Sequence, residues 1–244
     1  MSSPIPRRSL EPSDELGIFR PPLNPWRVVG IALAMFVLQV GVGLSLTPGF
    51  DLRVAVAMNS LHTGWIGALC SAIYQIFEPL PSIAMTAVLA GVIWKVCNLL
   101  TAVAFAGVVA LTWIPSELIK VIVQRGRPDI EALPYPFYPP QTDASFPSGH
   151  TAFIVALVIA LAYVATGTRW HHVVVTVGTI LTACVALALS IDAVHYPTDI
   201  LASVAWSLAM APAARMVWVD RVLPRVPGLA PRGTSGGPGT RLIA

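Results

Sequence analysis

Long apolar runs, separated by short polar or proline-rich stretches, dominate the pattern of residues along this chain. A transmembrane helix needs about 20 mostly apolar residues. Six segments approach that length, and prolines, charged residues or polar turns separate them. The predicted spans are residues 26–46, 80–95, 98–119, 150–166, 172–191 and 197–218. The pattern therefore predicts an all-α membrane protein with six transmembrane helices.

Two shorter segments lie between the first and second spans. Residues 51–61 mix apolar and polar positions, which is typical of a helix at the membrane surface. Residues 64–77 are apolar but short, so they predict either an interfacial or a half-buried helix.

The ends of the chain differ in composition from the spans. Residues 1–25 are polar and proline-rich, without a small-residue cleavage site at signal-peptide distance, and residues 219–244 are rich in proline and glycine. We therefore expect a retained flexible tail at 1–25, a membrane domain at 26–218 and a second flexible tail at 219–244.

Composition supports the membrane assignment. Hydrophobic residues make up 55% of the chain and charged residues only 11%, with a mean hydropathy of +0.73. A soluble globular domain is about 25% charged, so this chain has too little charge to cover a water-facing surface. The three cysteines lie inside apolar segments and indicate neither a disulfide framework nor a metal site. We expect no metal, cofactor or nucleic-acid partner, and the oligomeric state stays open.

Lysine and arginine predict the orientation of the spans. Eleven of the 15 would lie on one side of the membrane and four on the other, so the termini should be cytoplasmic. The expected location is a bacterial-type cytoplasmic (inner) membrane, with the loop after the third span facing outside. The four outer residues are Arg53, Lys120, Arg125 and Arg127. Three of these four stand together in KVIVQRGRP, which suggests that they bind something.

Three polar clusters lie at helix ends that the predicted topology places on this outer face. Lys120 and Arg127 end the third span, PSGH (residues 147–150) begins the fourth, and HYPTD (residues 195–199) begins the sixth. Taken singly, they could be interfacial anchors, a helix cap and a polar seam between two helices. Their occurrence in order, on one face and among few other charges, favours a functional site.

The residue types in these clusters suit phosphoryl transfer. Lys120, Arg127, the Ser148 hydroxyl and the backbone N–H of Gly149 could hold phosphate oxygens. His195 and Asp199 are four residues apart at a helix start, so the carboxylate could orient the imidazole for nucleophilic attack. A second histidine, His150, could protonate the leaving oxygen.

KVIVQRGRP, FPSGH and HYPTD resemble the three signature motifs of the type 2 phosphatidic acid phosphatase (PAP2) superfamily, K-x6-R-P, P-S-G-H and S-R-x5-H-x3-D. The resemblance covers roughly residues 50–215. It implies six spans with an extracytoplasmic site between helix ends and no metal. It implies that His195 forms a phosphohistidine, Asp199 positions it and His150 is the general acid. Lys120, Arg127, Ser148 and Gly149 would bind the phosphate.

The third motif departs from the family pattern at one position. Leu189 stands where the family has arginine, six residues before His195. Loss of one charge-assisted contact to phosphate, worth about 1.5–3 kcal/mol, is a handicap and does not force inactivity. Arg125 could compensate in part, as a further substrate-binding residue. The nearby Asp192 could pair with Arg125 or contact a sugar or glycerol hydroxyl of the substrate.

The resemblance implies a membrane lipid phosphatase. Polyprenyl phosphates and diphosphates are the favoured substrates, with phosphatidate and phosphatidylglycerophosphate close behind. Two alternatives stay open, namely a non-catalytic or lipid-binding relative, because of Leu189, and a lipid phosphotransferase. Soluble vanadium haloperoxidases share the motifs, but six apolar spans argue against that class.

Overall fold

The computed structural model describes residue 18 and residues 24–47 and 49–227, which form helices and loops without a strand. The helices are α1 (Pro25–Ser45), α2 (Gly49–Asn59), α3 (Gly64–Ile76), α4 (Pro79–Val96), α5 (Leu99–Trp113), α6 (Pro115–Val123), the 3₁₀ turn η3 (Ile130–Ala132), α7 (Gly149–Ala165), α8 (His171–Ile191), α9 (Pro197–Arg215), the π-helical segment η4 (Met216–Val222) and the 3₁₀ turn η5 (Leu223–Arg225).

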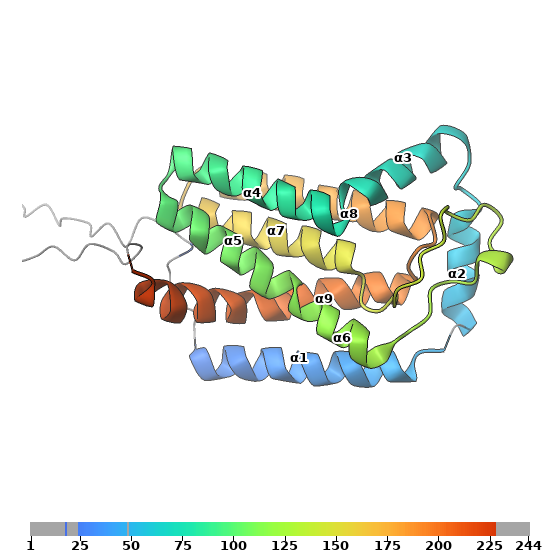
Figure 1. Cartoon of the computed structure of the whole chain (residues 1–244), viewed down its shortest axis with the longest axis horizontal. Coiled ribbons are helices and arrows are strands. Elements are labelled where there is room, and N and C mark those ends of the chain that lie inside the picture. The colour runs from blue at the N-terminus through green and yellow to red at the C-terminus, as the bar shows by residue number, and fades with distance from the viewer. Residues whose placement is uncertain (1–17, 19–23, 48, 228–244) are drawn as a thin grey trace, which may run out of the picture.

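The long helices run side by side, and α2 lies across one end of the bundle (Figure 1). Five helical segments are long and apolar enough to cross a membrane, namely Pro25–Ser45, Pro79–Val96, Leu99–Val123, His171–Ile191 and Pro197–Arg225. The sixth predicted span corresponds to α7, which is apolar but shorter, with 17 residues. All six predicted helices are therefore present, and the chain is a multi-pass membrane protein. Its first long helix begins, and its last one ends, at the end of the bundle opposite α2.

Side chains at the helix boundaries explain where the elements begin and end. The Asn24 side chain accepts hydrogen bonds from the first turn of α1, and Asn98 does the same for α5 at 2.8 Å. Pro115 cannot donate the hydrogen bond that would continue α5, so α6 begins there as a separate segment. Gln124 adopts a left-handed backbone conformation with φ of 50° and ends α6.

The core lies around α7, in which eleven of the 17 residues are buried. Phe105 on α5, Phe153 on α7 and Leu189 on α8 belong to one buried apolar cluster there. Hydrogen bonds between helices add to this packing, since the Trp206 indole donates to the carbonyl oxygen of Thr112 at 2.9 Å. The contacts fix the start of α7, which carries PSGH, between α5 and α9.

The shorter predicted elements are present too. The predicted helix at 51–61 is α2 and the apolar segment at 64–77 is α3. Helical structure continues through η4 and η5 to Arg225, seven residues beyond the predicted end of the last span at 218. The remaining parts of the two predicted tails, residues 1–17, 19–23 and 228–244, lie outside the described residues.

Candidate active site

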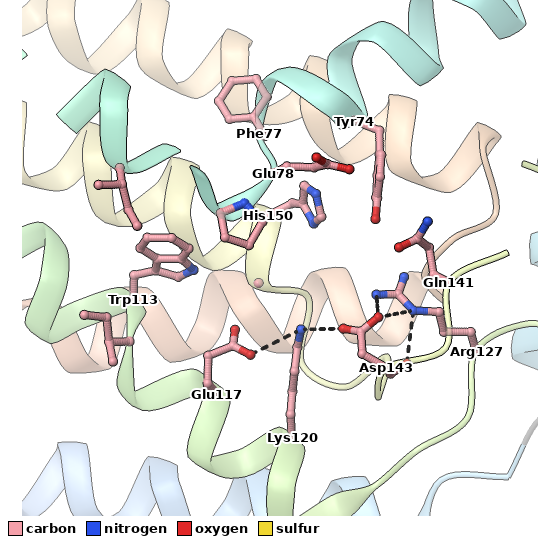
Figure 2. A pocket seen from close by; sticks show the side chains of 14 residues that line it. Tyr74, Phe77, Glu78, Trp113, Glu117, Lys120, Arg127, Gln141, Asp143 and His150 are labelled. Carbon is pink, nitrogen blue, oxygen red and sulfur yellow. Dashed lines mark hydrogen bonds and ion pairs between the residues drawn. The ribbon is translucent and has the colours of Figure 1, made fainter. Parts of the chain in front are cut away.

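The first motif places two cations next to one acidic residue of the long loop before α7. The Lys120 ammonium lies 3.4 Å from Glu117 Oε2 and 3.4 Å from Asp143 Oδ2. Arg127 donates to Asp143 Oδ1 from Nη2 at 2.8 Å and from Nε at 3.2 Å (Figure 2). Its Nη1 donates to the carbonyl oxygen of Val194 at 2.6 Å. Arg127 therefore joins the first motif directly to the segment that carries His195.

The second motif forms the start of α7, and its glycine lies close to side chains of α6. A Cβ atom at Gly149 would lie 2.9 Å from Glu117 Oε1 and 3.5 Å from Lys120 Nζ. A side chain at position 149 would therefore displace the Glu117 carboxylate from the N-terminus of α7, whereas the Lys120 distance is an ordinary contact. Ser148 is the N-cap residue, and its Oγ accepts from the Thr151 N–H at 3.3 Å. The Ser148 hydroxyl is buried in this cap, and Ser148 does not line the neighbouring cavity, in contrast to its predicted contact with phosphate.

The two histidines predicted to do chemistry lie next to each other, with ring centroids 5.9 Å apart. Both are buried, and neither Nε2 atom has a hydrogen-bond partner among the described residues. The His150 ring also stacks on Tyr74 of α3, with centroids 4.4 Å apart. An unpaired buried nitrogen is costly unless a ligand uses it, so the two Nε2 atoms are candidates for contact with a ligand.

The orientation of His195 comes from a backbone carbonyl, contrary to the expectation that Asp199 accepts its N–H. His195 Nδ1 donates to the carbonyl oxygen of Ser145 at 2.9 Å, whereas Asp199 Oδ2 is 3.8 Å away. Asp199 Oδ2 instead accepts from the Tyr196 N–H at 2.9 Å. A carbonyl oxygen can only accept, so Nδ1 carries the proton and Nε2 of a neutral ring has a free lone pair.

Electrostatics keep this ring neutral. Burial lowers the pKa of His195 well below its ordinary value, and the charges of Arg127 and Lys120 lower it further. Because only a neutral imidazole has a lone pair to donate, these effects favour the nucleophilic form at pH 7.

Arg125, predicted as a further substrate-binding residue, does not line the cavity that contains Lys120 and Arg127 and pairs with acidic residues instead. Its Nη1 donates to Asp199 Oδ1 at 2.5 Å and its Nη2 to Asp51 Oδ2 at 2.7 Å. The Thr198 hydroxyl accepts a hydrogen bond from Arg125 and donates one to Asp51. The guanidinium carbon of Arg125 lies 4.0 Å from the centroid of the Tyr196 ring. Arg125 therefore binds two carboxylates, and on Asp199 it binds the oxygen that does not accept from the Tyr196 N–H. The cavity beside His150 is not lined by Arg125.

A cavity of about 480 Å³ connects the cations with apolar side chains. Its polar end contains Lys120, Arg127, Asp143, Gly149 and His150, and its apolar walls come from α3, α4, α5 and the residue between α5 and α6 (Figure 2). The apolar residues that line it are Phe77, Pro79, Ile83, Trp113 and Ile114. His195 is fully buried next to His150 and does not line this cavity. Among the described residues, no group of three or more His, Cys, Asp or Glu side chains could hold a metal ion.

The position of the missing arginine is filled by apolar packing. Leu189 is fully buried in the main core cluster. Asp192 pairs with His62, with Nε2 and Oδ1 3.0 Å apart, and not with Arg125. His62 Nδ1 lies 2.8 Å from the carbonyl oxygen of Tyr135, so Nδ1 carries a proton and Nε2 faces Asp192. This pair connects the segment between α2 and α3 to the turn before His195.

The ionisation of Asp192 gives a testable pH dependence. Burial raises the pKa of Asp192 to about 7, although His62 and Ser71 act to lower it. Between pH 3.8 and about 7 the folded protein therefore binds more protons than the unfolded chain, so rising pH lowers the free energy of unfolding. The variant Asp192→Asn cannot ionise. We expect it to gain stability relative to the wild type as pH rises from about 5 to about 7, with a constant difference above about 8. Thermal unfolding across this range measures the effect, and parallel pH profiles would contradict it.

Several residues of the site carry no signal in the sequence. Asp143 lies in a loop without a fixed spacing to the motifs, and Asp51 lies on α2, far away in sequence. Ser145 acts through its backbone, which any residue could supply. Tyr74 sits in an apolar helix, where an aromatic residue normally indicates packing.

Comparisons with known proteins agree with the motif pattern. A family model described as the PAP2 superfamily matches residues 95–222, which is more than half of the chain. A solved structure described as the first transmembrane PAP2 type phosphatidylglycerolphosphate phosphatase from Bacillus subtilis is similar, with a TM-score of 0.64 and 15% sequence identity. That match covers 81% of this chain and 98% of the other. The search of curated proteins finds no match.

Proposed function

Because the chain belongs to the PAP2 superfamily, we propose that it is an integral membrane phosphatase that hydrolyses a lipid phosphate or diphosphate. The observation that carries the proposal is the pair of unpartnered Nε2 atoms of His195 and His150 beside Lys120 and Arg127. Two cations suit a phosphoryl group, and two imidazoles supply a nucleophile and a proton donor. Asp199 is proposed to support His195 at longer range, in addition to the Ser145 carbonyl.

The reaction would proceed in two steps. His195 Nε2 attacks phosphorus, the bond from phosphorus to the lipid oxygen breaks, and that oxygen takes a proton from His150, which the negative charge of the bound phosphate would favour in its protonated form. In the second step His150 takes a proton from water, the water oxygen attacks the phosphohistidine, and inorganic phosphate leaves as His195 is restored. Lys120, Arg127 and the N–H groups at the start of α7 would stabilise the charge that develops on the equatorial oxygens. This route needs no metal ion.

We propose a polyprenyl phosphate or diphosphate as the substrate, with phosphatidylglycerophosphate as the second candidate. The apolar walls of the cavity suit a lipid chain next to a terminal phosphoryl group. The name of the similar Bacillus subtilis protein favours the second candidate. The bias of lysine and arginine supports cytoplasmic termini and a site that faces outside, in a bacterial inner membrane.

Phosphate release from a panel of lipids tests the proposal. The purified protein in detergent is incubated with undecaprenyl diphosphate, undecaprenyl phosphate, phosphatidylglycerophosphate and phosphatidate, each with and without EDTA. We expect release from at least one lipid and the same rate in EDTA. No release from any of them would favour a non-catalytic, lipid-binding relative, and product that forms only with an added alcohol acceptor would identify a phosphotransferase.

A further inference from the structure

The phosphate-binding cations of the proposed site are occupied by a carboxylate of the same chain. Asp143 Oδ1 accepts two N–H groups from Arg127, and Asp143 Oδ2 lies 3.4 Å from the Lys120 ammonium (Figure 2). A phosphate would be bound in the same way, with one oxygen on the arginine fork and a second oxygen on the lysine. Asp143 thus stands where a substrate phosphate would bind.

Asp143 is the partner that can move. Its side chain is 56% exposed, whereas those of Arg127 and Lys120 are 9% and 13% exposed. Arg127 is fixed by its hydrogen bond to Val194, and Lys120 lies on α6. Asp143 lies in the loop between η3 and α7, so its carboxylate can turn toward water while both cations stay in place.

Asp143 also remains charged at working pH. Burial acts to raise its pKa, but the charges of Arg127 and Lys120 outweigh this and hold the pKa below its usual value. The site therefore contains one full negative charge that any incoming anion has to displace.

We propose that Asp143 is a specificity-determining residue, a charge filter that admits dianionic terminal phosphates and rejects monoanionic phosphodiesters. This inference rests on the proposed function and narrows its substrate class. The attraction between an anion and two cations is proportional to the charge of the anion. A phosphodiester carries the same single charge as Asp143 and gains little by replacing it. A phosphomonoester is a dianion above its second pKa of about 6, and it gains roughly twice the attraction.

The filter matters because phosphodiester lipids surround the protein in large excess. The headgroups of ordinary membrane phospholipids present a single negative charge on a diester phosphate. Without Asp143 they would compete for Lys120 and Arg127 at the polar end of the cavity. With Asp143, terminal phosphates are selected by charge before any contact with the lipid chain.

Binding of two small phosphates at about pH 8 tests the proposal without turnover. Methyl phosphate is the dianionic probe and dimethyl phosphate the monoanionic one, and dissociation constants are measured on the detergent-purified full chain. We expect Asp143→Asn to strengthen binding of dimethyl phosphate by about tenfold or more. The preference of the wild type for methyl phosphate should shrink accordingly. Glu131→Gln is the matched control, because it removes an exposed charge from η3, which precedes that loop, and Glu131 pairs with neither cation.

Each outcome decides for or against the filter. If Asp143→Asn weakens both probes, Asp143 positions the cations and the proposal is wrong. If dimethyl phosphate binds the variant no better than the wild type, or neither probe binds, the proposal is wrong as well. An altered preference in Glu131→Gln would mean that general surface charge is responsible. Binding that follows the filter in a protein without lipid turnover would contradict the proposed function and leave the filter intact.

Discussion

Replacing His195 with alanine is expected to reduce the rate of lipid phosphate hydrolysis by roughly 10⁴-fold or more at saturating substrate. His195 has the only Nε2 in the described part of the site that combines a neutral ring, a fixed tautomer and a position beside Arg127. Without this nitrogen no phosphohistidine can form, and the cations alone bind substrate without supplying a nucleophile. Initial rates of phosphate release from the best substrate of the lipid panel measure the loss.

The controls separate chemistry from folding. His195 is fully buried, so His195→Gln is tested beside His195→Ala, and both are compared with the wild type by thermal unfolding. His172→Ala should be indistinguishable from the wild type, because His172 is exposed at the opposite end of α8. Hydrolysis within tenfold of the wild-type rate in both His195 variants would rule this residue out as the nucleophile.

The helices could be predicted well because their signals are local. Apolar runs of the required length give the spans, and a capping Asn24 or Pro197 at a first turn marks a boundary. The junction at Pro115 was harder to predict, since α6 keeps the apolar character of α5 and only the missing N–H separates them. The helical continuation past residue 218 has no such signal, because Asp220 and Arg221 there suit either a helix end or a tail.

The site was predictable at the level of motifs but not of contacts. The motif pattern predicted that Lys120, His150 and His195 lie at one end of the bundle. In the structure His150 lines a cavity with Lys120, and its ring lies 5.9 Å from that of His195. The motif pattern could not assign the acceptor for His195, since the carbonyl of Ser145 belongs to the backbone and leaves no trace in residue identity.

The two neighbouring arginines show the same limit. Arg125 and Arg127 are two residues apart after the end of a helix, and the K-x6-R-P spacing selects Arg127 without showing where the side chain of Arg125 lies. The structure separates them by their acidic partners, Asp143 for Arg127 and Asp51 with Asp199 for Arg125. Because Asp51 comes from a helix more than 70 residues earlier, this choice depends on the tertiary fold.

Replacing Arg125 with alanine is expected to destabilise the protein by about 3–5 kcal/mol, because it leaves two buried carboxylates without their cation. The side chains of Arg125, Asp51 and Asp199 are at most 7% exposed, so in the folded protein these carboxylates depend on Arg125 more than on bulk water. Arg125→Lys should recover only part of the loss, since an ammonium lacks the planar fork that reaches both carboxylates. Arg53→Ala is the control, because Arg53 is exposed on α2 near Asp51. Thermal unfolding in detergent measures the difference.

The kinetic pattern of the Arg125 variants distinguishes a positioning residue from a phosphate ligand. If Arg125 acts by holding Asp199 behind His195, Arg125→Lys should lower kcat and leave KM nearly unchanged, because the groups that contact phosphate remain. A rise in KM with unchanged kcat would instead mean that Arg125 binds the substrate and compensates for the arginine that Leu189 replaces. In the double variant Arg125→Ala/Asp51→Asn, one of the two carboxylates that lost their cation is neutral, so part of the stability should return. Asp199 still lacks its cation there, so kcat should stay low. Recovery of kcat along with stability would show that Arg125 serves folding alone.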